Sequence, residues 1–134
     1  AGSGETRGTM EEGEIDVKAV QVLFQECFSL PKVELHAHLS GSLKPETFME
    51  LAEKKGVSLD HLDFYHVDMA MSFEIFKALS KVITELPVVK RIAKEMIDDY
   101  FNHNTKYMEI RSTPKKLQEC TFRDYVEALI EVVQ

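Results

Sequence analysis

The chain has 134 residues, and its 16 Lys and Arg residues against 23 Asp and Glu residues give a formal net charge of −7. This acidic balance argues against a nucleic-acid-binding protein, because no basic stripe is available to neutralise phosphates. No apolar run approaches the roughly 18–20 residues that cross a bilayer, which excludes a membrane-spanning segment. The length allows one domain at most, and the 44% hydrophobic content indicates an ordinary globular one.

The cysteines and the two ends of the chain carry further expectations. Cys27 and Cys120 form no C-x-x-C pair, and no apolar leader follows a charged start, so we expect a cytoplasmic protein. Residues 1–13 are small, polar and glycine-rich, which is typical of a disordered lead or a cloning remnant. The last helical pattern reaches Gln134 without a stop signal, so we expect a piece of a longer protein.

The first half of the chain shows three regular patterns. Residues 20–28 carry a short apolar helix face. Apolar and polar side chains then alternate over residues 32–39, which predicts a β-strand. A helix is expected to begin at Pro45 and to end at Gly56, because proline fits a first helical turn and glycine fits a C-cap.

The second half adds two helices, a strand and a last helix. Ser72 is predicted to cap one helix, and Pro87 to open a longer one whose apolar residues stay in register up to position 101. Residues 106–112 are predicted to form a second strand. The last helix follows Thr121, and its apolar stripe comprises Phe122, Tyr125, Val126, Leu129, Ile130 and Val133.

Two strands separated by helices predict a parallel α/β arrangement, because parallel pairing needs a long crossover. The crossover runs from about Ser40 to Thr105, which is longer than a single helix requires, and its extra helices could cover one mouth of a barrel. Two strands alone cannot close a barrel. The missing strands must therefore come from residues outside this chain, or the fold is a smaller α/β unit.

The candidate chemistry lies at the end of the first predicted strand. His36 and His38 are two residues apart, so both imidazoles project from one face, roughly 6–7 Å apart at the backbone. Two nitrogens at that spacing can converge on one metal ion. The alternative is a structural histidine pair held by the backbone. The metal interpretation is favoured because a polar strand face needs partners or a ligand.

Other residues near the strands have structural interpretations. The opposite face of the first strand is apolar and is expected to pack against helices through Val33, Leu35, Ala37 and Leu39. Glu34, Glu109 and Arg111 are expected to form a buried ion pair rather than to act in catalysis. The adjacent Asp98 and Asp99 are interpreted as part of a solvated helix face.

Two segments of the chain resemble a known enzyme family. Residues 30–42, LPKVELHAHLSGS, look like the opening strand of the adenosine deaminase family of zinc aminohydrolases. Residues 107–115, YMEIRSTPK, look like the second strand of its adenosine deaminase-like branch, which contains the N6-methyl-AMP deaminases. The two motifs are spaced as that branch spaces them, and together they are far more specific than a lone H-x-H.

The resemblance implies an α/β fold, the N-terminal part of a (β/α)8 TIM-type barrel with its first two strands and helical crossover, over residues 14–134. It implies that His36 and His38 are ligands of one Zn²⁺ ion. In the family, zinc lowers the pKa of a water molecule that attacks C6 of the purine. A third histidine, an aspartate and an acid/base glutamate come from later strands, so no catalytic residue is assigned here. We expect this chain to be inactive by itself.

The resemblance also implies substrate contacts from the strand ends. They are assigned to His38, Ser40, Ser80, Ser112, Thr113, Pro114 and Lys115. Ser40 stands where adenosine deaminases have an aspartate and where the methyl-AMP branch usually has an asparagine, so it departs from both but shares the neutrality of that branch. A neutral hydroxyl there removes the repulsion that a carboxylate would exert on a phosphate. Ser112, Thr113 and Lys115 add two hydroxyls and a cation suited to phosphate. The alternative for that stretch is a plain turn at the end of a strand.

Three functional interpretations stay open. The first is zinc-dependent hydrolysis of N6-methyl-AMP to IMP and methylamine by the full-length protein, expected to be a monomer that acts on a small purine nucleotide or nucleoside. The second is deamination of adenosine to inosine, or the activity of a more distant amidohydrolase that also opens with H-x-H. The third is a non-catalytic truncated chain that binds a partner or fails to fold.

Overall fold

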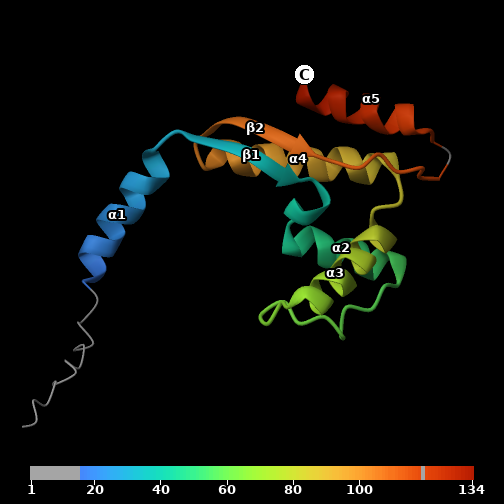
Figure 1. Cartoon of the computed structure of the whole chain (residues 1–134), viewed down its shortest axis with the longest axis horizontal. Helices are drawn as coiled ribbons and strands as arrows, with labels where there is room; N and C mark the ends of the chain where they lie inside the picture. The colour runs from blue at the N-terminus through green and yellow to red at the C-terminus, as the bar shows by residue number, and fades with distance from the viewer. Residues whose placement is uncertain (1–15, 119) are drawn as a thin grey trace, which may run out of the picture. The chain divides into compact units, whose positions relative to one another are not determined.

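The computed structural model describes residues 16–118 and 120–134, and the disordered lead predicted for residues 1–13 lies outside them. The chain divides into two compact units after Leu30. The first unit holds helix α1 (Val17–Ser29), and the second holds all the later elements (Figure 1). None of the helices in the described ranges has the length and apolar character needed to span a membrane.

Helix α1 forms where the sequence predicts an apolar helix face, and Asp16 caps its start. The Asp16 carboxylate accepts hydrogen bonds from the backbone N–H groups of Lys18 and Ala19 at 2.9 and 3.2 Å, which satisfies two donors that a helix start leaves open. The rings of Phe24 and Phe28 stack with their centroids 6.2 Å apart. Every residue of α1 is exposed, so its apolar face lies on the surface of this unit.

Strands β1 (Lys32–His38) and β2 (Thr105–Arg111) pair in parallel, as the sequence predicts. His38 lies opposite Arg111 at the C-terminal ends of the two strands, and the register is irregular between Glu34 and Ala37. Within the described residues the sheet consists of these two strands. The C-terminal ends of both strands therefore meet at one edge, where most of the predicted site residues also lie.

The crossover from β1 to β2 contains a short turn and three helices. The 3-10 turn η1 (Ser40–Ser42) leads into α2 (Pro45–Lys55), which ends at Gly56 with φ 64° and ψ 31°. Pro45 and Gly56 therefore bound α2 as predicted. Helix α2 packs against α3 (Met69–Val82), and the long helix α4 (Leu86–Asn102) runs back along the sheet (Figure 1).

The start of α3 differs from the prediction that Ser72 caps it. The N-cap is Asp68, whose carboxylate accepts a hydrogen bond from the N–H of Met71 at 2.7 Å. Ser72 lies in the first turn, and its hydroxyl donates to the Asp68 carbonyl oxygen at 2.9 Å. Aspartate caps a helix as well as serine does, so the helix begins about one turn earlier than expected.

Helix α4 supplies the centre of the hydrophobic core. Its buried residues follow the predicted helical period and are Val89, Ile92, Ala93 and Met96. They belong to one cluster with buried residues of β1, α2 and α3, including Ala37, Leu51 and Leu79. This packing fixes the C-terminal end of β1 against the helices of the crossover.

The apolar face of β1 is covered only in its C-terminal half. The sequence predicts that four apolar residues, Val33, Leu35, Ala37 and Leu39, pack against helices. Only Ala37 of the strand and Leu39, which directly follows it, are buried, whereas Val33 and Leu35 are 62% and 57% exposed. The reason is that η1 packs against β1 and α4 packs against β2 and η1. The expected packing is therefore wrong for the N-terminal half of β1 within the described residues.

Helix α5 (Phe122–Val133) packs against α4 and begins with a capping box. The hydroxyl of Thr121 accepts from the N–H of Asp124, and the Asp124 carboxylate accepts from the N–H of Thr121. The hydrogen bond from the Thr121 N–H has the largest effect on the pKa of Asp124, and one from the Thr121 hydroxyl has the next largest. Both hold this pKa below its usual range. Of the predicted apolar stripe only part is covered, because Tyr125 and Leu129 pack inward while the exposed members are Phe122, Val126, Ile130 and Val133.

Candidate functional site

His36 and His38 lie on the face of β1 opposite its buried residue Ala37, because side chains alternate along a strand. Their Nε2 atoms are 3.0 Å apart. Their ring centroids are 4.9 Å apart, with an angle of 44° between the ring planes. The two imidazoles therefore converge on one point, as their spacing in the sequence predicts.

Hydrogen bonds hold the backbone on both sides of this pair. The N–H of Leu39 donates to a carbonyl oxygen of β2 at 2.9 Å, and the hydroxyl of Ser42 donates to the carbonyl oxygen of His38 at 2.9 Å. The N–H of His36 donates to the carboxylate of Glu34 at 2.8 Å, within the stretch where the strand register is irregular. The position of each ring is thus set by β1, its neighbour β2 and the turn η1.

The histidine pair fits part of a zinc site. Zinc binds imidazole nitrogens at about 2.0–2.1 Å, so two nitrogens 3.0 Å apart can both reach one ion. Two imidazole lone pairs aimed at each other repel unless a proton or a cation lies between them. Within residues 16–118 and 120–134, no group of three or more His, Cys, Asp or Glu side chains could hold a metal ion. The described part of the chain therefore offers two of the ligands that a zinc ion needs, and not a complete set of zinc ligands.

A small polar cavity lies at the C-terminal ends of β1 and β2. Its volume is about 90 Å³. Five of the predicted substrate-binding residues line it, namely His38, Ser40, Ser112, Thr113 and Lys115. Hydroxyl groups and a cation are the groups that bind an oxyanion. The structure thus brings together the residues that the sequence marks as suited to phosphate.

Two of the predicted substrate-binding residues lie outside this cavity. Ser80 is exposed on α3, and its hydroxyl donates to the carbonyl oxygen of Lys77 at 2.7 Å. Pro114 is exposed beside Thr113. Neither residue lines the cavity at the strand ends, and their roles in substrate binding stay predictions.

Arg111 lines the cavity but is not among the predicted site residues. It forms the expected ion pair with Glu109 at 2.9 Å, and the same nitrogen donates to the carbonyl oxygen of Leu35 at 3.2 Å. The pair is not buried, since the two side chains are 49% and 39% exposed. Glu34 takes no part in it and instead accepts from the backbone of His36. Arg111 thus lines the cavity, while its guanidinium is engaged with Glu109 and with the Leu35 carbonyl oxygen and so links the two strands.

Tyr125 of α5 is a second cavity residue outside the predicted set. The sequence places it in the apolar stripe of the last helix, and it is indeed only 3% exposed. Its hydroxyl lies 2.8 Å from Oγ of Ser112. The signal available in the sequence is the phenol itself, because a tyrosine hydroxyl in a buried stripe needs a hydrogen-bond partner.

An apolar groove lies next to the polar cavity, and both contain Ser40. Its volume is about 490 Å³, and its lining residues include Gly41, Phe48, Met49, Phe64, Tyr65 and Leu79. The rings of Phe48 and Phe64 meet edge to face with centroids 6.2 Å apart. The carboxylate of Asp63 holds the loop that contains Phe64 by accepting hydrogen bonds, among them one from the N–H of Tyr65. These hydrogen bonds, of which the one from Tyr65 has the largest effect, hold the pKa of Asp63 below its usual range. Such a groove suits a flat aromatic group.

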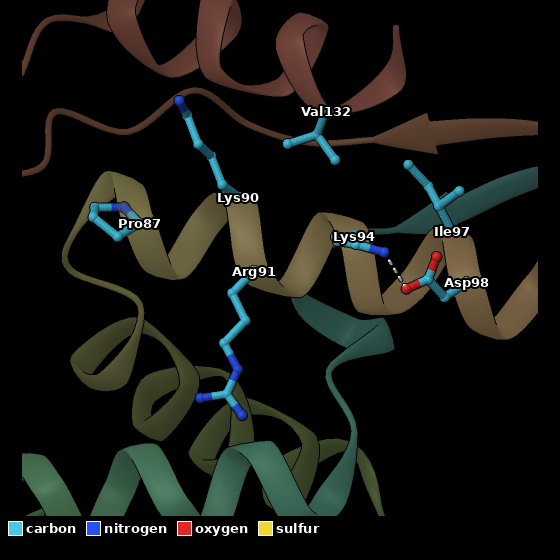
Figure 2. Close-up of a pocket in the computed structure, with 7 residues that line it drawn as sticks. All are labelled: Pro87, Lys90, Arg91, Lys94, Ile97, Asp98 and Val132. Carbon is cyan, nitrogen blue, oxygen red and sulfur yellow. Dashed lines mark hydrogen bonds and ion pairs between the residues drawn. The ribbon is translucent and has the colours of Figure 1, made fainter.

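Another groove, of about 560 Å³, lies on α4 and α5 (Figure 2). Each of its three cations is already paired with a carboxylate, in the pairs Lys90–Glu131, Arg91–Glu50 and Lys94–Asp98. The Lys94–Asp98 pair is more than half exposed, which confirms the interpretation of Asp98 as part of a solvated helix face. The paired charges favour a structural surface over a ligand site.

Known proteins resemble most of the chain. The adenosine deaminase family matches residues 31–134. An N6-mAMP deaminase of Arabidopsis thaliana is 38% identical over 114 residues, which are 77% of this chain and 32% of that protein. An adenosine deaminase of Clostridium perfringens is 34% identical over 119 residues, which are 79% of this chain and 36% of that protein. The chain thus spans about a third of the length of these relatives.

Solved structures agree in fold. The crystal structure of Arabidopsis ADAL complexed with GMP matches with a TM-score of 0.72 and 34% identity, over 81% of this chain and 35% of that chain. The structure of Arabidopsis N6-mAMP deaminase MAPDA matches with a TM-score of 0.70 and 36% identity, over 81% of this chain and 36% of that chain. The predicted fold class, the N-terminal part of an α/β TIM-type barrel, is confirmed. The chain belongs to the adenosine deaminase family, as the motifs of its two strands indicate.

Proposed function

We propose that the complete protein is a zinc-dependent hydrolase that converts N6-methyl-AMP and water to IMP and methylamine, and that residues 14–134 are the N-terminal portion of its barrel domain. One observation carries the proposal. Two imidazole nitrogens 3.0 Å apart lie at the ends of the same strands that form a polar cavity. Substrates of TIM barrels bind at this end of the strands.

His36 and His38 would hold the zinc ion, together with ligands from later strands. A bound zinc ion supplies Lewis acidity and activates water near neutral pH. The residues of this chain present the two Nε2 atoms at one point, and His38 also lines the cavity. The proton donor to the leaving amine would come from a later strand, so we expect the 134-residue chain to be inactive alone.

The preference for a monophosphate rests on charge. A carboxylate about 4 Å from a phosphate charge costs on the order of 4 kcal/mol at an effective dielectric constant near 20, and the neutral Ser40 avoids that cost. Lys115 adds a cation, while Ser112 and Thr113 add hydroxyls. The apolar groove beside Ser40 would take the aromatic base. Relatives that are N6-methyl-AMP deaminases, and solved relatives complexed with GMP and IMP, support a nucleotide.

Adenosine is the second candidate substrate, since an adenosine deaminase of Clostridium perfringens is 34% identical to this chain. An assay of the complete protein separates the candidates by comparing N6-methyl-AMP, AMP and adenosine at equal concentration. The proposal predicts the highest kcat/KM on N6-methyl-AMP, with methylamine and IMP released in equal amounts. A higher kcat/KM on adenosine would overturn the choice of substrate.

A further inference from the structure

Tyr125 connects the buried face of α5 to the polar cavity at the strand ends. Only 3% of the residue is exposed, its hydroxyl lies 2.8 Å from Oγ of Ser112, and both residues line the cavity. The remaining buried member of α5 is Ala128, so the phenol is the polar group that this helix buries. A polar atom in that position needs a structural or a functional reason.

The direction of the hydrogen bond between the two hydroxyls follows from their chemistry. A buried phenol must place its hydrogen on an acceptor, and Ser112 Oγ lies at hydrogen-bond distance from it. A phenol O–H is also a stronger hydrogen-bond donor than the hydroxyl of a serine, so Tyr125 is the better donor of the two. With Tyr125 donating, the hydroxyl hydrogen of Ser112 stays available for another acceptor, since a serine hydroxyl has one donor and two acceptor sites.

The surroundings of Ser112 show which acceptor fits. The cavity that it lines also contains Ser40, Thr113 and Lys115, beside the apolar residues Leu39, Ile83 and Ile92. Arg111 lines it as well, with its guanidinium paired to Glu109. Its volume of about 90 Å³ is small beside the 490 Å³ of the adjacent apolar groove. A compact anion therefore fits the cavity, and a purine ring fits the groove.

We propose that Tyr125 is a positioning residue that holds Ser112 as a hydrogen-bond donor to the phosphate of a nucleoside monophosphate. The inference rests on the proposed function, because it requires the nucleotide to bind with its phosphate in this cavity. Tyr125 acts through Ser112 and not on the reacting atoms. Its removal should weaken recognition of the phosphate and leave recognition of the nucleoside part intact.

The test compares binding of IMP with binding of inosine to the complete protein by isothermal titration calorimetry. Tyr125→Phe removes one hydroxyl and keeps the ring that fills the core. We expect the Kd for IMP to rise about tenfold, because Ser112 is then no longer held as a hydrogen-bond donor to the charged phosphate. The Kd for inosine should change less than about twofold. Tyr100→Phe is the matched control, since Tyr100 packs partly buried against the same core, lies outside this cavity and should change neither Kd.

Ser112→Ala provides the second arm. If Tyr125 acts through Ser112, this variant weakens IMP binding by a similar factor, and the double variant is no weaker than either single variant. Equal weakening of IMP and inosine, an unchanged Kd for IMP, or additive losses in the double variant would each overturn the inference. Turnover of N6-methyl-AMP by the wild-type protein is measured in parallel. Binding of IMP without turnover would refute the proposed function and leave the role of Tyr125 to be decided by the binding data.

Discussion

Arg91 of α4 donates two hydrogen bonds to the carboxylate of Glu50 in α2, with nitrogen–oxygen distances of 2.9 and 2.7 Å. The same guanidinium donates through Nε to Glu95 at 2.8 Å, and Glu95 accepts from the buried hydroxyl of Thr47 at 2.7 Å. This network joins α2 to α4. It therefore fixes the helix that follows η1, and with it the approach to Ser40.

The contact between Arg91 and Glu50 should make stability sensitive to acid. Hydrogen bonds from Arg91, and next from Lys54, lower the pKa of Glu50 from 4.5 to about 2. A carboxyl whose pKa is depressed in the folded state stabilises that state above its unfolded pKa, and this contribution is lost as the pH falls from about 4.5 to about 2. Glu50→Gln should lower the melting temperature at pH 7 and flatten its decline below pH 4.5.

The effect at Glu50 should be modest, since both partners are more than a third exposed and solvent screens the pair. Melting curves by circular dichroism between pH 2 and 7 provide the measurement. Glu53→Gln, at an exposed position of the same helix, is the control. Identical pH profiles for the two variants would show that the Arg91 contact contributes nothing to stability.

The two glycines around α2 should respond differently to alanine. Gly56 has φ 64°, and a Cβ added there meets nothing within 4 Å, so the cost is that of the left-handed backbone, about 1–2 kcal/mol. Gly41 has no positive φ, and a Cβ added there would lie 3.7 Å from Cβ of His38, an ordinary contact. The backbone of the turn after β1 therefore does not require a glycine at position 41.

Urea unfolding of the two glycine variants tests this difference. Gly56→Ala should lower the free energy of unfolding by about 1–2 kcal/mol, whereas Gly41→Ala should stay within about 0.5 kcal/mol of the unmodified chain. If Gly41→Ala lowered the free energy of unfolding more than Gly56→Ala does, that result would contradict this account of the backbone geometry.

Leu35 of β1 and Leu39, which directly follows β1, have different surroundings, because Leu35 is 57% exposed and Leu39 is 1% exposed. Leu39→Ala should cost about 2–5 kcal/mol, the range for truncating a buried leucine. Leu35→Ala should cost less than about 0.5 kcal/mol in the 134-residue chain. In the complete protein, where further strands and helices would cover Leu35, we expect its cost to approach that of Leu39. Denaturant titrations of both chain lengths test this, and a Leu35→Ala cost that stays negligible in the complete protein would argue against that covering.

The sequence predicts the elements that local rules determine. The alternation of apolar and polar residues predicts the ends of β1 and β2 to within one residue, because a period of two residues is specific to strands. Pro45 and Gly56 locate α2 because their backbone preferences are strong. The cap of α3 is missed because Asp68 and Ser72 are equally good candidates by residue type. The choice between them depends on where the helix packs, which local rules do not contain.

The candidate site is predictable in part. The spacing of His36 and His38 predicts their convergence, because both lie on one strand. Arg111 and Tyr125 join the cavity through the pairing of β2 with β1 and the packing of α5 on α4, which are tertiary relationships. Ser80 shows the reverse case, since a position inferred from resemblance alone does not reach the cavity in the described structure.

Charge at position 40 should control the choice between nucleotide and nucleoside. Ser40→Asp places a carboxylate at the wall of the polar cavity, and a repulsion of about 4 kcal/mol corresponds to roughly a thousandfold loss in binding. We expect the KM for N6-methyl-AMP to rise by up to that factor while the KM for adenosine changes only a few-fold. Steady-state kinetics of the complete protein measure both values. Ser40→Ala is the neutral control, and an equal rise in KM for both substrates would place the phosphate elsewhere.

The zinc content of the complete protein tests the role of the histidine pair most directly. Inductively coupled plasma mass spectrometry should find about one zinc ion per chain in the wild-type protein and in His61→Ala, which changes an exposed histidine elsewhere. Zinc should be nearly absent from the variant that carries both His36→Ala and His38→Ala, because the ion then loses two imidazole ligands. A full equivalent of zinc in that double variant would contradict the account.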